Sequence, residues 1–176
     1  MFENFNAGTL LMIVLAAIIG IYLYRLDKKE KSDPLVALYK QYGTLTADTL
    51  AATPDDELVN AVAANIMAKT NRLHPDVYSL IPVLSHGQVA VYSVWIFCHE
   101  LETTDMASLL RSPSVRFAES AADGFSLIGA DLCVDALLAA MESQDASALQ
   151  ETIADQKPLS LCAAYIRENP NEFVDL

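Results

Sequence analysis

Residues 88–101, QVAVYSVWIFCHEL, decide the fold of this chain. The apolar side chains in this stretch recur at helical spacing and cover most of the circumference of a helix: Val91, Val94, Trp95, Phe97, Cys98 and Leu101. A helix that is apolar almost all round must be buried by neighbouring helices. We therefore predict that Gln88–Leu101 is the central core helix of a larger domain.

The sequence on either side of this stretch predicts more helices and no sheet. Ser85 and Gln88 fit a capping box, Gly129 suits the end of a helix, and Thr53 suits a helix N-cap. Among the side chains expected to point inward are Leu132 and Ala164. Helical spacing predicts helices over 35–42, 54–72, 104–110, 113–128, 131–141, 147–155 and 158–169, with a short helix possible over 77–84. No alternating strand pattern appears, so the predicted fold class is all-α, a compact multi-helix bundle.

A second apolar stretch, Gly8–Tyr24 (GTLLMIVLAAIIGIYLY), lies near the start of the chain and contains no charged residue. As a helix at ~1.5 Å per residue, it would be about 25 Å long. The apolar residues on either side bring it close to the ~30 Å hydrocarbon thickness of a bilayer. We predict a single transmembrane helix that begins at Gly8, runs through Leu15 and Gly20 and ends at Tyr24.

Two other interpretations of this stretch fit less well. A cleaved signal peptide needs basic residues before it and a small-residue cleavage site after it, and this chain has neither. A buried core helix is the second alternative, but its apolar face would not run around the full circumference: Gln88–Leu101 keeps some polar positions, and Gly8–Tyr24 is apolar all round. Ala16 and Gly20 have the spacing that lets two membrane helices pack as a homodimer, and lipid-facing small residues are the alternative.

Basic residues follow the stretch and none precedes it: Arg25, Lys28, Lys29 and Lys31. The positive-inside rule then places the N-terminus outside the cell and the C-terminal domain in the cytoplasm, at the inner (plasma) membrane. The expected organisation is an anchor with its basic flank over 1–31, a linker with a short helix over 32–52, and an acidic helical domain over 53–176.

The predicted domain is strongly acidic. From Ser32 onward the chain has 20 Asp and Glu against 7 Lys and Arg, a net charge of −13. A protein that binds nucleic acid directly normally has a basic face. We expect no direct binding of nucleic acid, and an anionic bilayer should repel the domain while attracting its basic flank.

Like-charged acidic residues recur four positions apart in three predicted helices: Glu119/Asp123, Asp131/Asp135 and Glu151/Asp155. Each such pair destabilises its helix by roughly 0.2–0.5 kcal/mol. The repeated cost motivates one hypothesis, an interaction face that acts as a decoy for a basic, DNA-binding protein, although net charge speaks to solubility before partners. The alternative is an acidic surface that serves solubility alone.

Motifs for catalysis or metal binding are incomplete. His99-Glu100 begins like the metalloprotease motif H-E-x-x-H, but Thr103 stands where the second His would be. A hydrolase would need at least two of His99, Glu100, Glu102 and Asp105 to converge in a deep pocket. The cysteines Cys98, Cys133 and Cys162 form no C-x-x-C pair, which indicates reduced core residues. We expect no cofactor, no metal and no enzymatic activity.

Three motifs resemble a small all-helical bacterial family that is named after a DNA-mimic protein and is otherwise a domain of unknown function. They are Val94–Glu102 (VWIFCHELE), Phe125–Ala130 (FSLIGA) and Tyr165–Phe173 (YIRENPNEF). The resemblance covers about residues 55–176. Where the family usually has an Asn-Gly-Gly-Phe turn, this chain has Thr103–Met106. The resemblance implies a helical fold and self-association, and fold alone does not carry one member's DNA mimicry to another.

These observations favour a membrane-anchored cytoplasmic domain that binds another protein. The first alternative is an acidic DNA mimic that sequesters a basic DNA-binding protein. The second is a hydrolase whose site the sequence does not reveal.

Overall fold

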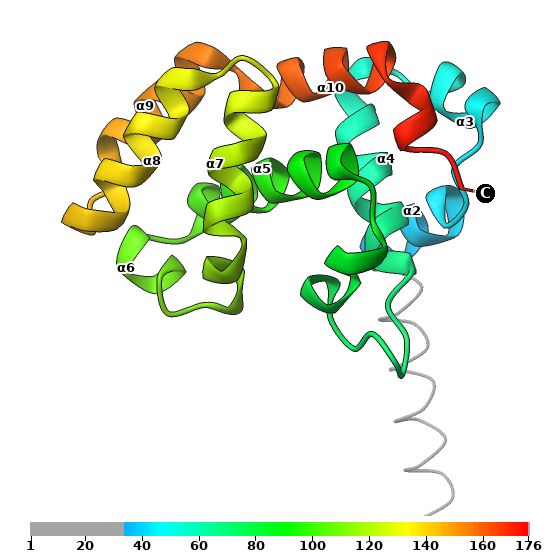
Figure 1. The fold of residues 1–176 in the computed structure, drawn as a ribbon, viewed down its shortest axis with the longest axis horizontal. Coiled ribbons are helices and arrows are strands. Elements are labelled where there is room, and N and C mark those ends of the chain that lie inside the picture. Colours follow the sequence, from blue (N-terminus) through cyan, green and yellow to red (C-terminus); the bar gives the residue numbers. More distant parts are fainter. Residues whose placement is uncertain (1–33, 176) are drawn as a thin grey trace, which may run out of the picture. The chain divides into compact units, whose positions relative to one another are not determined.

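The computed structural model of this chain describes the backbone of residues 34–175 and the side chains of residues 37–175. These residues form nine α-helices and three short 3₁₀ helices, without a strand, which confirms the predicted all-α class. In chain order (Figure 1) the elements are α2 (Pro34–Tyr42), α3 (Ala47–Ala52), α4 (Asp55–Ala68), η1 (Val77–Val83), α5 (His86–Thr103), α6 (Met106–Leu109), η2 (Pro113–Phe117), α7 (Ala118–Leu127), α8 (Asp131–Ser143), α9 (Ser147–Gln156), α10 (Pro158–Glu168) and η3 (Pro170–Glu172). Gln41–Leu176 forms one compact unit, which holds all of these elements from α3 onward.

The predicted membrane helix, Gly8–Tyr24, lies outside the described residues. Within residues 34–175, no helix combines the length and the apolarity needed to cross a bilayer. The membrane anchor therefore stays a prediction from the sequence.

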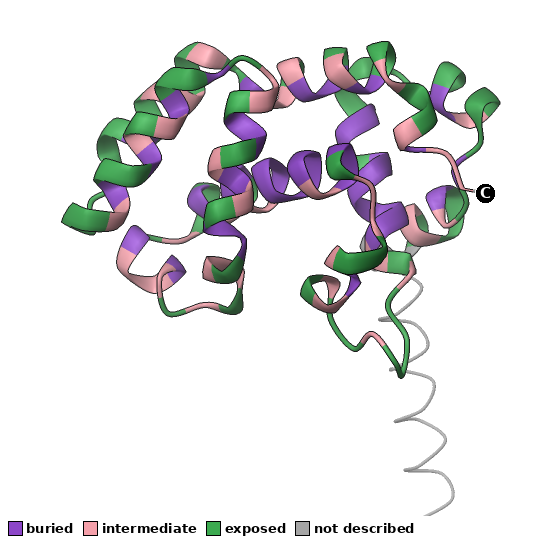
Figure 2. Cartoon of the chain, viewed as in Figure 1, coloured by how far each residue is buried: buried purple, intermediate pink, exposed green. Residues whose placement is uncertain are grey.

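Helix α5 is the core of the domain, as predicted. Eleven of its eighteen residues are buried, and α4, α7 and α10 pack against it. Figure 2 shows the buried residues concentrated on α5 and on the neighbouring part of α4. The predicted capping box starts the helix: Gln88 N–H donates to the Ser85 hydroxyl at 3.0 Å, and Ser85 N–H donates to Gln88 Oε1 at 3.0 Å.

Helices α5 and α7 approach each other closely because α7 carries a glycine at the contact. A Cβ atom on Gly124 would lie 2.7 Å from the carbonyl oxygen of Ala90, which is too short for any real carbon–oxygen contact. The same helix ends as predicted at Gly129, where φ is +77° and Ala130 N–H donates to the Phe125 carbonyl at 2.8 Å. Glycine adopts this left-handed conformation without the steric cost that other residues meet.

Helices α8 and α9 pack on each other and form an outer layer. Only Cys133, Leu137 and Ala140 are buried on α8, and only Leu149 is buried on α9. The rest of both helices faces solvent or is partly covered (Figure 2). One narrow apolar side is enough to hold each helix, so their outward sides are free to carry charge.

Some local predictions were wrong. Thr53 does not cap α4; its hydroxyl donates to the Thr49 carbonyl at 2.7 Å and so ends α3, a helix that the sequence analysis left unassigned. The predicted continuous helix over 113–128 is divided at Phe117 into η2 and α7.

Two residues predicted to point inward point outward. Leu132 is 60% exposed, because α8 is covered along Cys133, Leu137 and Ala140 only. Ala164 is also exposed, and α10 buries Cys162, Ala163 and Ile166 instead. Both errors shift the apolar side of the helix by one residue, which a short pattern rich in Ala and Leu does not resolve.

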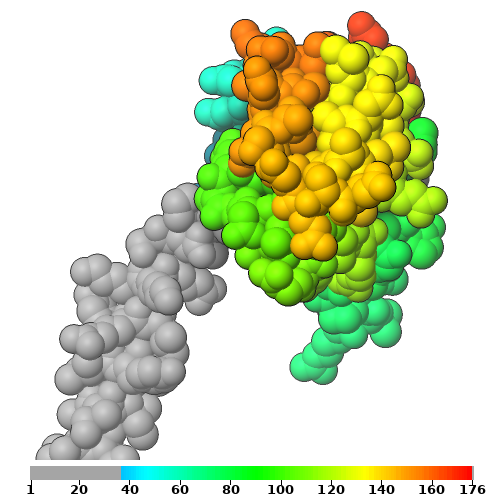
Figure 3. Space-filling view, turned by 90° about the vertical axis from the view of Figure 1, so that its left-hand side faces the viewer, coloured from blue at the N-terminus to red at the C-terminus, as the bar shows by residue number. Residues whose placement is uncertain are grey.

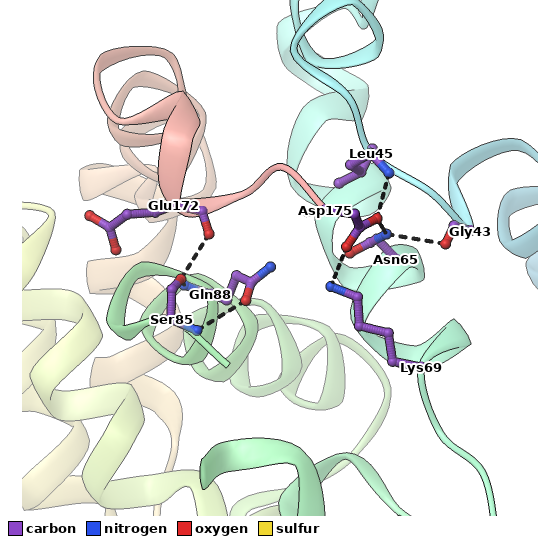
Figure 4. Close-up of polar contacts among 8 residues, drawn as sticks. All are labelled: Gly43, Leu45, Asn65, Lys69, Ser85, Gln88, Glu172 and Asp175. Atoms are coloured by element: carbon purple, nitrogen blue, oxygen red, sulfur yellow. Dashed lines mark hydrogen bonds and ion pairs between the residues drawn. The ribbon is translucent and has the colours of Figure 1, made fainter. Parts of the chain in front are cut away.

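The C-terminal segment ties distant parts of the domain together around Asp175 (Figure 4). One carboxylate oxygen of Asp175 accepts from Leu45 N–H at 2.7 Å and from Asn65 Nδ2 at 2.8 Å. The other lies 2.7 Å from Lys69 Nζ. Glu172 adds a second attachment, since its carbonyl oxygen accepts from the Ser85 hydroxyl at 2.8 Å. The last residues therefore join the start of α5 to the loop before α3 and to α4.

Asp175 makes the stability of this domain depend on pH. Partial burial disfavours its charged form, but hydrogen bonds from Lys69, Leu45 N–H and Asn65 outweigh that effect and lower its pKa. A carboxyl group with a lowered folded-state pKa contributes stability above its unfolded pKa and loses that contribution as pH falls through the folded value. We expect Asp175→Asn to reduce the free energy of unfolding by about 1–3 kcal/mol at neutral pH.

Urea unfolding at a series of pH values checks this expectation. The difference between wild type and Asp175→Asn should be full above about pH 5 and should shrink at lower pH, where the wild-type carboxylate is protonated. Asp135→Asn, on an exposed part of α8, is the matched control; its difference from wild type should be opposite in sign and stay within the roughly 0.2–0.5 kcal/mol of its repulsion with Asp131. A pH-independent difference for Asp175→Asn would contradict the assignment.

Candidate functional site

The six acidic residues predicted to form an interaction face are all exposed. Two lie on each of three successive helices: Glu119 and Asp123 on α7, Asp131 and Asp135 on α8, Glu151 and Asp155 on α9. On each helix the two acidic residues lie four positions apart and so share one side. The buried residues of the same helix lie on the other side. Helix α8 packs against both α7 and α9. Figure 3 shows α8 and α9, in yellow and orange, side by side on one face of the molecule.

This part of the chain has no basic residue to balance its acids. Residues 117–156 contain eight Asp and Glu and no Lys, Arg or His. No ion pair formed by the described residues involves any of the eight. Asp131 accepts one hydrogen bond, from the Ser126 hydroxyl at 3.3 Å. We call the outward sides of α7, α8 and α9 the acidic surface.

Two large apolar side chains lie among these carboxylates on α8. Leu132 is 60% exposed and Leu138 is 56% exposed. Leu138 falls on the same line of the helix as Asp131, Asp135 and Glu142, since these positions recur every three or four residues. Leu132 was predicted to point inward, and the sequence yielded no prediction for Leu138. The exposure of Leu138 could have been predicted from the sequence, because it lies three residues after Asp135 and so on the same side of the helix as Asp131 and Asp135.

The residues considered for a hydrolase do not converge within the described part of the chain. Glu100 Oε1 accepts from the Ser114 hydroxyl at 2.9 Å, and Asp105 Oδ1 accepts from Ser108 N–H at 2.7 Å as the cap of α6. His99 and Glu102 approach only to 3.9 Å, with both side chains more than half exposed. The His99 ring instead stacks on Trp95, with ring centroids 5.3 Å apart. Each group therefore has a local structural role.

The cysteines are buried and free, as predicted from their apolar surroundings. Burial raises the pKa of the Cys98 thiol to about 12, so it is a weak nucleophile at neutral pH. Among residues 34–175 no group of three or more His, Cys, Asp or Glu side chains is placed to hold a metal ion.

Two solvent-open grooves lie near α10. One, of about 600 Å³, runs between α4 and α10 and includes Asp55, Asn60 and Ala163. The other, of about 310 Å³, lies where α5, α9 and α10 meet and includes Cys98 and Ile153. None of the six predicted acidic residues lines either groove. The six acidic residues therefore lie on an exposed face apart from both grooves, a form that suits a macromolecule better than a small molecule.

Comparisons with models of known protein families, with curated proteins and with solved structures find no match for this chain. The resemblance to the DNA-mimic-protein-like family stays a prediction that rests on three motifs. The structure places the first motif in α5, the second at the end of α7 with its turn, and the third in α10 and η3.

If the acids of α8 repel one another, replacing one by a base should stabilise the fold. Asp135→Lys removes an unfavourable pair with Asp131 and creates a favourable acid-to-base pair four residues apart. The expected gain in the free energy of unfolding is about 0.4–1 kcal/mol at low salt, because each of the two changes contributes ~0.2–0.5 kcal/mol.

Chemical denaturation at low and high salt measures this gain. The gain should shrink in about 1 M salt, where the screening length falls to ~3 Å. Asp135→Gln separates the two contributions, since it removes the repulsion without adding a base. A destabilised Asp135→Lys variant would show that the carboxylate has a structural partner.

Proposed function

We propose that this protein is a membrane-anchored helical interaction domain whose acidic surface binds a basic cytoplasmic protein. Gly8–Tyr24 would hold the chain in the inner membrane, with the domain on the cytoplasmic side. The acidic surface would attract its partner electrostatically, and Leu132 and Leu138 would supply the apolar contact.

The observation that carries this proposal is the pair of exposed leucines among unpaired carboxylates on α8. An acidic surface that served solubility alone would gain nothing from exposed large apolar side chains. A protein interface combines an apolar centre, which supplies affinity, with charges around it that steer association and select the partner. The absence of any basic residue from 117–156 sets the sign of the complementary partner surface.

A DNA mimic is the second candidate function, and it would use the same acidic surface. Rows of carboxylates can stand in for backbone phosphates, and the motifs in α5, α7 and α10 resemble a family that includes such a protein. In that case the partner is a DNA-binding protein, and DNA should compete with this chain for it.

The anchor has its own support in the sequence. Seventeen uncharged residues are followed by four basic ones, the arrangement that places a membrane helix with its C-terminal side in the cytoplasm. Because the anionic leaflet attracts basic residues and repels acidic ones, the net charge of −13 from Ser32 onward would keep the acidic surface directed away from the lipid.

The anchor predicts that the full chain stays in the membrane fraction after alkaline washing. Leu15→Arg with Ile18→Arg should release it, because each Arg near the centre of a membrane helix costs about 2.5–3.5 kcal/mol. Leu15→Ile with Ile18→Leu is the matched control and should stay with the membrane. Recovery of the wild-type chain in the soluble fraction would refute the anchor.

The acidic surface predicts capture of a basic protein from detergent-solubilised membranes and cytosol. Wild-type chain should retain it, and a triple variant, Asp131→Lys, Asp135→Lys and Glu142→Lys, should not. Retention should fall steeply between about 50 and 300 mM salt, because electrostatic attraction is screened over that range. Leu138→Ser should weaken capture with less effect on its salt dependence.

Two results would count against this interface. One is capture of the same protein by wild type and by the triple variant, and the other is capture that does not respond to salt. Circular dichroism of each variant checks that the helices remain. Displacement of the captured protein by duplex DNA distinguishes the DNA mimic from the general interaction domain.

A further inference from the structure

The connection between α4 and α5 carries a second exposed apolar group, separate from the acidic surface. Of the five large apolar side chains that are exposed within the described residues, three lie here: Leu73 (85%), Val83 (67%) and Tyr78 (39%). Residues 70–85 extend away from the helices around them in Figure 1, and Figure 3 shows the same segment, in blue-green, protruding. We call these residues the projecting segment.

The charge around the projecting segment is weakly positive, in contrast to the acidic surface. Arg72 is exposed beside Leu73, and no ion pair among the described residues engages it. Arg116 lies over the Tyr78 ring, 4.5 Å from its centroid. His74 belongs to the segment and His86 follows it directly.

Two acidic groups near this segment pair with bases, and a third, Glu172, accepts from Gly87 N–H at 2.7 Å and from the Tyr165 hydroxyl at 3.0 Å. Asp76, the only acidic residue within 70–85, pairs with Arg116 at 2.7 Å. Asp175 pairs with Lys69, just before the segment, at 2.7 Å. The surface that remains is apolar with a weak positive charge, whereas residues 117–156 carry eight acids and no base.

The local structure holds Leu73 outward at the tip of the segment, whereas the Tyr78 ring lies edge-on to Phe117 with centroids 5.5 Å apart. Asn71 Oδ1 accepts from Leu73 N–H at 2.8 Å and from His74 N–H at 3.1 Å, which fixes a tight turn at the tip. His74 Nδ1 lies 2.9 Å from the Ser79 carbonyl oxygen, and Asp76 caps η1 by accepting from Ser79 N–H at 2.9 Å. Leu80 turns into the core and is 2% exposed. The segment is therefore an ordered projection whose one fully buried side chain is Leu80.

We propose that the projecting segment docks onto the anionic surface of the membrane that holds the anchor. Exposed apolar side chains with nearby Lys and Arg are the combination that inserts into the headgroup region of a bilayer, to a depth of about 5–10 Å. The basic residues meet the negative potential of the cytoplasmic leaflet. A protein partner of the acidic surface would not fit here, because its bases would face Arg72 and would find the Asp76 carboxylate already paired with Arg116.

This inference rests on the proposed anchoring and adds an orientation to it. A domain that rested on the projecting segment would be held at a second point besides the anchor. The anionic lipid would attract the bases of the projecting segment and repel the acidic surface. Both forces would therefore favour the orientation in which the projecting segment faces the membrane. The docking therefore needs no change within the domain.

The test uses the full chain in phosphatidylcholine vesicles that contain about 30% phosphatidylglycerol, a negative surface like that of an inner leaflet. Leu73→Cys and Val83→Cys are each labelled with an environment-sensitive fluorophore. The matched control is Leu132→Cys, which has a similar exposure on the acidic surface. The natural cysteines are at most 4% exposed, so wild type treated with the same fluorophore should take up no label.

At positions 73 and 83, we expect blue-shifted emission and at least twofold stronger quenching by spin-labelled lipids than at position 132. Arg72→Glu in the Leu73→Cys background should reduce the quenching, as should vesicles of phosphatidylcholine alone. Circular dichroism confirms that each labelled chain is folded.

Two results would overturn the docking while leaving the anchor intact. In one, the chain floats with the vesicles but positions 73 and 132 are quenched equally. In the other, position 73 is shielded without lipid quenching, which would indicate contact with protein instead. A chain that does not float with the vesicles would refute the proposed anchoring itself, so the two failures are distinguishable.

Discussion

Burial of α5 is the constraint on which the rest of this domain depends. The helix exposes so little polar surface that it is stable in water only when other helices surround it. Helices α4, α7 and α10 provide that cover, and Gly124 lets α7 approach until a Cβ atom would not fit. The C-terminal segment is attached at two places. Glu172 bonds to Ser85 at the start of α5, and Asp175 bonds to Leu45 before α3 and to Lys69 at the end of α4.

The same constraint explains why function is to be sought on the outside of the bundle. Side chains that fill the core are apolar, and the polar ones within it serve local bonds, as Trp95 does by donating to Asn60 Oδ1 at 2.9 Å. Helices α8 and α9 bury only a narrow side each. Their remaining surface is under little packing constraint, and a run of carboxylates that raises the energy of its own helices is tolerated there.

The sequence predicted the fold class, the central helix and its capping box because these depend on local chemistry and on spacing within one helix. It did not resolve which side of α8 is covered, so Leu132 was placed inward. In a helix rich in Ala and Leu, several faces look equally apolar, and tertiary packing decides among them. Thr53 shows the same limit: its hydroxyl suits an N-cap, but the end of α3 takes it first.

The exposed apolar side chains divide into two groups with opposite electrostatic surroundings, and this division favours two different partners over one. Leu132 and Leu138 lie among carboxylates, so a basic partner gains both apolar contact and charge attraction there. Leu73 adjoins Arg72, which no ion pair of the described residues engages, so an anionic surface would gain both on that side. A single partner would need opposite charges at the two places. The negative membrane and the basic protein proposed above would satisfy both requirements at once, and each would repel the surface that suits the other.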